Sequence, residues 1–241
     1  MTTIAIFGAG PALGMAVARR FGREGFRVAL VARSQERVDD MVRDLAADGV
    51  EAAGFPADIA GQDAALRVTG QIEARFGPID VLEYSPTPGR LFTTPLELDV
   101  ASITPLLGLY LHTPIALAGR VLPGMRERGH GGLLFAMGAS ARYPIPRLAA
   151  ASVVLPALRG YIHTMNAVLS ESGVYAGALL IGATIENSRN HRRGTAAFFN
   201  DGSMPVVKAE DLADRLWTMY ARRDRVEDVV APALLRGAEE R

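Results

Sequence analysis

The first twenty residues of the chain constrain its fold more than any other stretch. Thr3–Phe7 is a short apolar run typical of a buried strand, glycines follow it at once, and an Ala/Arg-rich helical pattern comes next. This order presents the N–H groups of a helix N-terminus to a phosphate. Gly8 and Gly10 would give a tight turn and backbone access to a pyrophosphate, and Gly14 would let the helix pack closely on the strand. The pattern predicts dinucleotide binding, with an ordinary strand-to-helix turn as the alternative.

Length, charge and cysteine content exclude several classes of protein. The 241 residues are long enough for one large α/β domain, and we expect a single domain over residues 1–241. Lys+Arg and Asp+Glu are equal at 26 each, so bulk charge predicts neither a nucleic-acid nor a membrane partner. The absence of cysteine excludes disulfides and thiolate metal sites, and no metal site is predicted. No leader and no apolar run of membrane-spanning length is recognised, so we expect a cytoplasmic protein.

Expected strands alternate with expected helices along the whole chain. The strands are apolar throughout rather than alternating, as strands buried on both faces are. The sequence therefore predicts an α/β fold: a Rossmann-like, doubly wound parallel sheet with helices on both faces. After the first strand and helix, the expected strands are 27–32, 51–55, 79–83, 133–137, 174–181 and 226–231, and the expected helices are 35–47, 63–76, 95–128, 148–169 and 209–222.

Several motifs at strand ends carry a family resemblance. Ala32-Arg33 follows the second strand, Asp58-Ile59 follows the third, and Gly138-Ala-Ser140 ends the fifth. With the glycine turn, these motifs make the chain similar to the short-chain dehydrogenase/reductase family over essentially its whole length. The family's opening motif, Gly-x-x-x-Gly-x-Gly, is met by Gly8, Ala12 and Gly14, with alanine in the middle slot. The resemblance implies an NAD(P)(H)-dependent oxidoreductase.

The same resemblance implies which residues bind the cofactor. An acid after the second strand would bind the ribose 2′-hydroxyl, but Ala32 carries no charge and Arg33 can pair with a phosphate, so NADP(H) is favoured and NAD(H) stays possible. A solvated surface arginine is the alternative for Arg33. Asp58 would hydrogen-bond the adenine amine, with a helix-capping aspartate as its alternative. The cofactor-binding residues expected are Gly8, Gly10, Ala12, Leu13, Gly14, Arg33, Asp58, Ile59, Ser85, Gly182 and Thr184.

The catalytic part of the family pattern is missing from the sequence. The family's tyrosine and the lysine four residues later should fall near 151–153 and 155–157, where the chain reads Ala-Ser-Val-Val-Leu-Pro-Ala. Lys208, the only lysine, lies far along the chain. Ser140 matches the family's serine, and Tyr110 aligns with the family's helix-four asparagine. We therefore predict an atypical member that lacks the Tyr-x-x-x-Lys motif, with Ser140 and Tyr110 as catalytic candidates.

Three functions remain open from the sequence. The first is reduction of a carbonyl or imine in a small metabolite, with Ser140 polarising the substrate and Tyr110 supplying a proton. The second is a non-redox enzyme (dehydratase, isomerase or cyclase), and the third is a catalytically silent cofactor-binding or sensor subunit. Glu83, Tyr84 and Tyr143 are weaker substrate-site candidates, listed with His112 as acid–base groups. A salt-bridged Glu83 and a buried, hydrogen-bonded Tyr110 are the structural alternatives.

Two further regions carry expectations about substrate and assembly. By resemblance, residues 186–208 form the substrate lid, where Arg189, Arg192 and Arg193 would meet an anionic substrate or the cofactor phosphates; a solvated loop is the alternative. The helix that ends at Arg128 and the helix over 148–169 are apolar enough to have a second buried side. We expect a homodimer or homotetramer.

Overall fold

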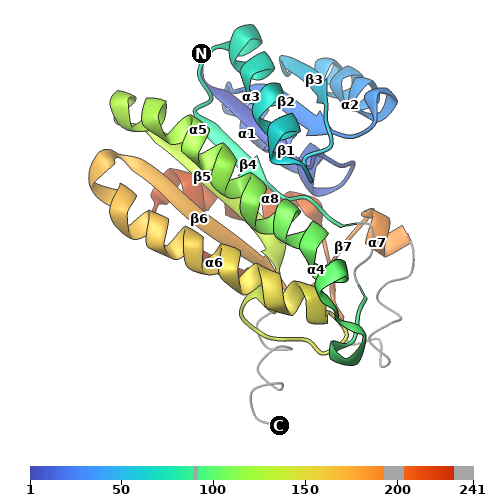
Figure 1. Cartoon of the computed structure of the whole chain (residues 1–241). Helices are drawn as coiled ribbons and strands as arrows, with labels where there is room; N and C mark the ends of the chain where they lie inside the picture. Colours follow the sequence, from blue (N-terminus) through green and yellow to red (C-terminus); the bar gives the residue numbers. More distant parts are fainter. Residues whose placement is uncertain (89–91, 193–203, 231–241) are drawn as a thin grey trace.

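The computed structural model (Figure 1) describes residues 1–88, 92–192 and 204–230, and these form a layered α/β structure. Seven parallel strands form the main sheet, in the order β3-β2-β1-β4-β5-β6-β9. The predicted fold class is therefore confirmed. The strands are β1 Thr3–Phe7, β2 Arg27–Ala32, β3 Ala52–Pro56, β4 Val81–Tyr84, β5 Gly131–Gly138, β6 Val174–Ile181 and β9 Glu227–Val230; β7 Thr184–Ile185 and β8 Val206–Val207 pair separately.

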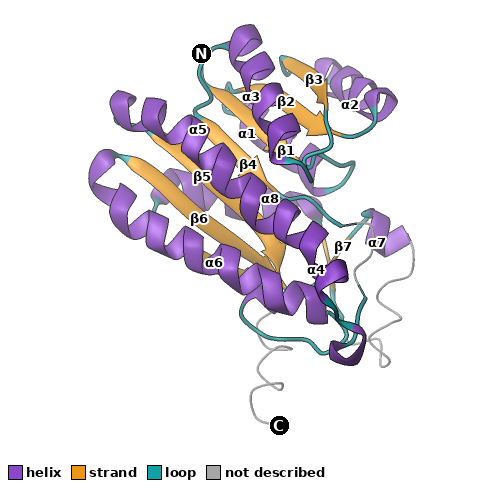
Figure 2. Ribbon diagram, viewed as in Figure 1, coloured by secondary structure: helices purple, strands orange, loops and turns teal. Residues whose placement is uncertain are grey.

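Helices cover both faces of the sheet (Figure 2). Side chains from α1 (Leu13–Arg23), α2 (Gln35–Ala47) and α8 (Ala209–Arg222) join one core. Side chains from α3 (Gln62–Phe76), α5 (Thr113–Arg128) and α6 (Ala149–Leu169) join the other, with α4 (Val100–Leu107) packed beside α6. The short helix α7 (Arg189–Arg192) lies near β7 at the carboxyl edge of the sheet.

Successive side chains along a strand point alternately into the two cores. In β1, Ile4 and Ile6 enter the core under α1 and α8, while Ala5 and Phe7 enter the opposite core. All four side chains are fully buried, which explains why the strands read as continuous apolar runs in the sequence. Local signals also hold at helix ends: the Ser34 hydroxyl caps α2 by accepting the Arg37 N–H at 3.4 Å, as predicted.

The long helix expected between residues 95 and 128 is interrupted. It comprises a 3₁₀ turn Pro95–Glu97, α4, a π-helical turn Gly108–His112, and α5. Pro114 has no N–H to donate, which fits a break in the regular α-helical ladder at this point. The stretch Val100–Arg128 is also, by length and composition alone, apolar enough to cross a membrane. The expectation that no such run exists was wrong, because Val100 to Gly119 holds no Asp, Glu, Lys or Arg.

One carboxylate of the edge strand β9, that of Glu227, pairs with side chains of α6 and of the segment after β5. Glu227 accepts hydrogen bonds from Arg142 at 3.0 Å and from Arg159, and its carboxylate lies 3.0 Å from His163 Nε2. Burial raises the pKa of Glu227, but the hydrogen bonds from Arg159, His163 and Arg142 outweigh burial and hold the pKa below its usual value. This cluster holds the edge strand β9, which pairs with β6, against α6.

Candidate functional site

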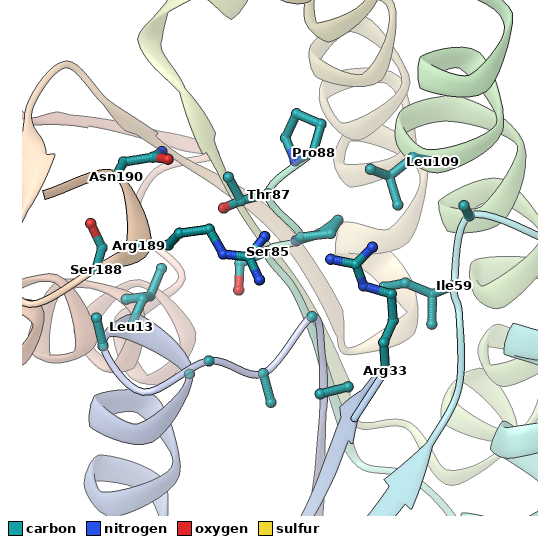
Figure 3. Close-up of a pocket in the computed structure, with 18 of the residues that line it drawn as sticks. Leu13, Arg33, Ile59, Ser85, Thr87, Pro88, Leu109, Ser188, Arg189 and Asn190 are labelled. Carbon is teal, nitrogen blue, oxygen red and sulfur yellow. The ribbon is translucent and has the colours of Figure 1, made fainter. Parts of the chain in front are cut away.

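A cavity of about 1130 Å³ lies at the carboxyl edge of the sheet (Figure 3). It sits over β1, whose neighbours β2 and β4 lead the chain in opposite directions across the sheet. Ligands of open α/β sheets bind at such a switch point. The wall contains the glycine turn, the end of β2, the segments that follow β3 and β4, and residues of α4 and α7.

The glycine turn has the geometry that its sequence predicts. Gly8 has a φ of +91°, and a Cβ on it would lie 2.7 Å from Pro86 Cα. A Cβ on Gly14 would lie 2.9 Å from Ala9 Cα, so the first turn of α1 packs closely on the end of β1. Gly10 has open space around its Cα, on the cavity side. No side chain caps α1 at Ala12, which leaves N–H groups of its first turn for a bound anion.

Most of the expected cofactor residues surround this cavity. The Arg33 guanidinium extends into it from the end of β2, near Ile59 (Figure 3). Asp58 lines the same wall, and its carboxylate accepts the Ala60 N–H at 3.1 Å within the turn after β3. It does not cap α3, whose N-cap is Gly61. The structure brings together Gly8, Gly10, Ala12, Leu13, Gly14, Arg33, Asp58, Ile59 and Ser85. Gly182 and Thr184 lie outside the lining; the Gly182 N–H donates to Val230 O, and Thr184 is 6% exposed.

The two catalytic candidates are buried, and neither lines the cavity. Tyr110, in the π-helical turn, is 7% exposed, and its hydroxyl donates to Pro86 O at 3.1 Å. Burial raises the pKa of Tyr110 well above its usual value. Ser140 is 1% exposed, and its Oγ has no hydrogen-bond partner among the described residues. Both roles stay predictions.

The part of α6 that passes Ser140 is apolar. Ala151, Val154 and Leu155 point into the core, and a Cβ on Gly138 would lie 3.5 Å from Ser140 Oγ and 3.7 Å from Leu155 Cδ1. The aliphatic Leu155 therefore packs near Gly138, two residues before Ser140. The sequence of this helix turn offers neither a phenol nor an amine.

The weaker substrate candidates also lie in the core. Tyr84 is 1% exposed and donates to Leu109 O, and burial raises the pKa of its hydroxyl well above the usual value. Tyr143 is 5% exposed, with the Arg142 guanidinium 5.3 Å from its ring centre. Glu83 is fully buried and in no ion pair within the described part of the chain, so the salt bridge proposed as its alternative is not formed. None of the three lines the cavity.

Other cavity residues come from segments that the sequence analysis gave no role. Spacing i, i+3 places Leu106 and Leu109 on the cavity, and the same kind of spacing brings Arg37, Asp40 and Asp44 of α2 there. Helical periodicity after Arg33 is a signal that could have found the α2 group.

Two of the three arginines expected in the lid line the cavity. These are Arg189 and Arg192, and the Arg189 side chain reaches toward Ser85 and Thr87 (Figure 3). Arg193 lies outside the described residues.

Comparison with known proteins identifies the family. Residues 2–194 match the family described as short chain dehydrogenase. The chain belongs to this family. It is 29% identical over 180 residues to a short chain dehydrogenase of Pseudocercospora fijiensis (73% of this chain, 58% of the relative). It is 29% identical over 182 residues to a putative ketoacyl reductase of Streptomyces coelicolor (73% and 68%). The chain thus spans little more than half the length of the first of these relatives.

Solved structures share the fold across almost the whole chain. The L-sorbose reductase of Gluconobacter frateurii, complexed with NADPH and L-sorbose, has a TM-score of 0.82 at 20% identity, covering 95% of this chain and 94% of the reductase. A single-substitution variant of actinorhodin polyketide ketoreductase, with NADPH, has a TM-score of 0.83 at 21% identity, with the same two coverages. These likenesses establish the arrangement of strands and helices of this dehydrogenase family member.

Proposed function

We propose that this protein is an oxidoreductase that binds NADP(H), with NAD(H) as the weaker cofactor, and acts on a carbonyl or imine of a small metabolite. The observation that carries the proposal is the pairing of an open glycine turn with Arg33 across one cavity at the switch point of the sheet. Gly10 leaves room for a ligand against the backbone, and the uncapped first turn of α1 favours an anion there. The residues present fit a phosphorylated dinucleotide.

Each part of the cavity has a counterpart in that cofactor. The glycine turn and the N-terminus of α1 would hold the pyrophosphate, and Arg33 would pair with the 2′-phosphate. Asp58 and Ile59 would contact the adenine, and Ser85 a ribose or phosphate oxygen. Gly182 and Thr184, which lie outside the described lining, are assigned to the nicotinamide end by family resemblance only. When bound, the nicotinamide supplies the hydride.

The site is atypical because the proton donor of the family is absent. Loss of a positioned acid typically costs about 10²–10⁴ in rate. Tyr110 and Ser140 are the candidates for that role, and both must gain access to the substrate. The Tyr110 hydroxyl donates to Pro86 O and has a raised pKa, while Ser140 is buried and its Oγ has no hydrogen-bond partner among the described residues. A substrate that is already a cationic iminium needs no proton, so imine reduction suits these surroundings better than ketone reduction.

Burial of Ser140 and Tyr110 also favours a second candidate function. A subunit that binds the dinucleotide but performs no chemistry needs no acid at the cavity wall. Turnover separates the two candidates. An enzyme oxidises NADPH in the presence of some member of a carbonyl and imine panel, whereas a silent subunit binds NADPH tightly and oxidises none of it.

A titration with nicotinamide fluorescence as the signal tests the cofactor. NADPH should bind more tightly than NADH, and Arg33→Ala should weaken NADPH by about 10–100-fold, the loss expected for a charge-assisted phosphate contact, while NADH changes little. Arg120→Ala is the matched control, since Arg120 is an exposed arginine on α5 that pairs with Glu73, and neither residue lines the cavity. Failure of both nucleotides to bind would refute the proposal.

The remaining assignments complete the proposal. The chain is a single cytoplasmic domain with a small-molecule substrate, no nucleic-acid or membrane partner, and a substrate lid over 186–208, of which 193–203 lie outside the described residues. A homodimer or homotetramer is supported by exposed apolar side chains on the outer faces of α5 and α6, with Ile115 41%, Val153 53% and Val168 73% exposed. Light scattering after size exclusion should give a dimer or tetramer, and Val153→Glu should shift it toward monomer.

A further inference from the structure

Glu83 is a carboxyl group placed inside an apolar core. It is 0% exposed, and neither carboxyl oxygen has a hydrogen-bond partner within the described part of the chain. Its partners in the sheet are Ile6 on β1 and Leu134 on β5. The buried described residues include no Lys, Arg or His, so no buried cation balances its charge. Burying a polar group without a hydrogen-bond partner lowers the stability of the folded chain, so the position of Glu83 calls for an explanation.

The described residues bring two titratable side chains into the core on this face of the sheet, both tyrosines: Tyr175 of β6, whose hydroxyl donates to Arg225 O at 2.6 Å, and the partly buried Tyr220 of α8. Buried side chains from α1 and α8 in this core are apolar, among them Leu13, Val17 and Leu212. The charged residues of the two helices lie on their partly or fully exposed sides: Arg19, Arg20, Arg23, Glu210, Asp211, Asp214, Arg215 and Arg222. Some of these pair with one another, as Arg20 does with Asp214 at 2.8 Å. The polar side chain that acts on Glu83 comes from the residue directly after its own strand.

That neighbour is Ser85, which connects the buried carboxyl to the cavity. Glu83 and Ser85 are two residues apart along the chain at the end of β4, and the Ser85 N–H continues the ladder by donating to Phe7 O at 3.0 Å, so the two side chains share a face. Ser85 lines the cavity beside the glycine turn (Figure 3). The next residue, Pro86, packs against Gly8. Glu83 thus lies directly beneath the junction of β4 and the glycine turn.

Burial favours the neutral form of Glu83 below about pH 8. Burial raises the pKa of Glu83 to about 8, and the Ser85 side chain lowers it only in part. A neutral carboxylic acid has one O–H to donate, whereas a carboxylate can only accept. Ser85 can act as acceptor and donor at once, so the protonation state of Glu83 decides which way the Ser85 proton points.

We propose that Glu83 is a positioning residue of the cofactor site: as a neutral acid it donates to Ser85 Oγ, so that the Ser85 hydroxyl donates to an acceptor oxygen of the bound dinucleotide. When Glu83 ionises, the Ser85 O–H turns back to the carboxylate. The cavity wall then presents an oxygen lone pair, above a buried negative charge, to an anionic ligand. The proposal rests on the proposed NADP(H) function and adds to it a pH-dependent affinity.

The measurement is the dissociation constant of NADPH between pH 6 and 9.5 for wild type, Glu83→Gln and Ser85→Ala. Wild-type affinity should be level up to about pH 7.5 and then fall by roughly tenfold or more by pH 9.5, approaching tenfold per pH unit. Glutamine keeps an N–H donor and cannot ionise, so Glu83→Gln should show no fall. Ser85→Ala should bind more weakly than wild type at pH 7 and lose most of the pH dependence.

Matched controls separate this proposal from the function on which it rests. Glu210→Gln, at an exposed acid on α8, should reproduce the wild-type profile. Circular dichroism at each pH confirms that every variant is folded. If wild type and Glu83→Gln bind NADPH with the same pH profile, the positioning role is wrong while NADP(H) binding stands. If no variant binds NADPH at any pH, the proposed function fails, and the positioning role fails with it.

Discussion

Replacing Glu83 with glutamine is expected to change how the stability of the folded chain depends on pH, whether or not any ligand binds. Burial raises the pKa of Glu83 from 4.5 to about 8. Between these values the folded chain holds a proton that the unfolded chain releases, so the free energy of unfolding falls as pH rises. At about 1.4 kcal/mol per unit over about 3.5 units, the cost reaches about 5 kcal/mol above pH 8 and about 3 kcal/mol at pH 7.

Urea unfolding followed by circular dichroism at pH 5, 6, 7 and 8 measures this cost. Other titrating groups cancel when the wild-type free energy is subtracted from that of Glu83→Gln. The free energy of unfolding of Glu83→Gln, relative to that of wild type, should rise by about 3–4 kcal/mol between pH 5 and pH 8. Glu210→Gln should stay parallel to wild type throughout. Parallel curves for Glu83→Gln and wild type would show that Glu83 ionises normally, and would refute the argument from burial.

Two further predictions concern the glycine turn and the edge strand. Gly14→Ala should lower the free energy of unfolding by about 1–3 kcal/mol, because its Cβ would meet Ala9, whereas Gly10→Ala, with open space around it, should keep the wild-type thermal midpoint. Glu227→Gln should cost about 1–3 kcal/mol at pH 7 in urea unfolding. Because the folded pKa of Glu227 lies below its unfolded value, that deficit should shrink as pH falls through the acid range; a constant deficit would contradict the pairing with Arg159.

Local patterns explain which parts of the fold were predictable. The α2 boundaries, Gln35–Ala47, and the β6 boundaries, Val174–Ile181, match the sequence prediction because helical and strand periodicity are properties of short segments. The glycine turn was predictable for the same reason. Arg33, Asp58 and Ser85 each follow a parallel strand closely, and carboxyl ends of parallel strands meet at one edge, so they line one cavity.

Strand-end position alone does not say which face a side chain takes or what covers it. Glu83 and Tyr84 end the same strand, yet they point to opposite faces of the sheet, and neither reaches the cavity. Tyr110 is buried within a π-helical turn that interrupts the helix, a feature that a regular 3.6-residue period does not reveal. These placements depend on packing between segments distant in the chain.

The sequence by itself determined the parallel α/β architecture and the glycine turn, since each depends on residue type and spacing within a short segment. Only the tertiary structure decided that Ser140 and Tyr110 are covered while Ser85 and Arg189 line the cavity. Only the structure also showed that Glu83 lies buried beneath Ser85, with no cation beside it among the described residues. Burial depends on which helices cross each strand, and desolvation by those helices, rather than the identity of the residue, sets the charge state of Glu83.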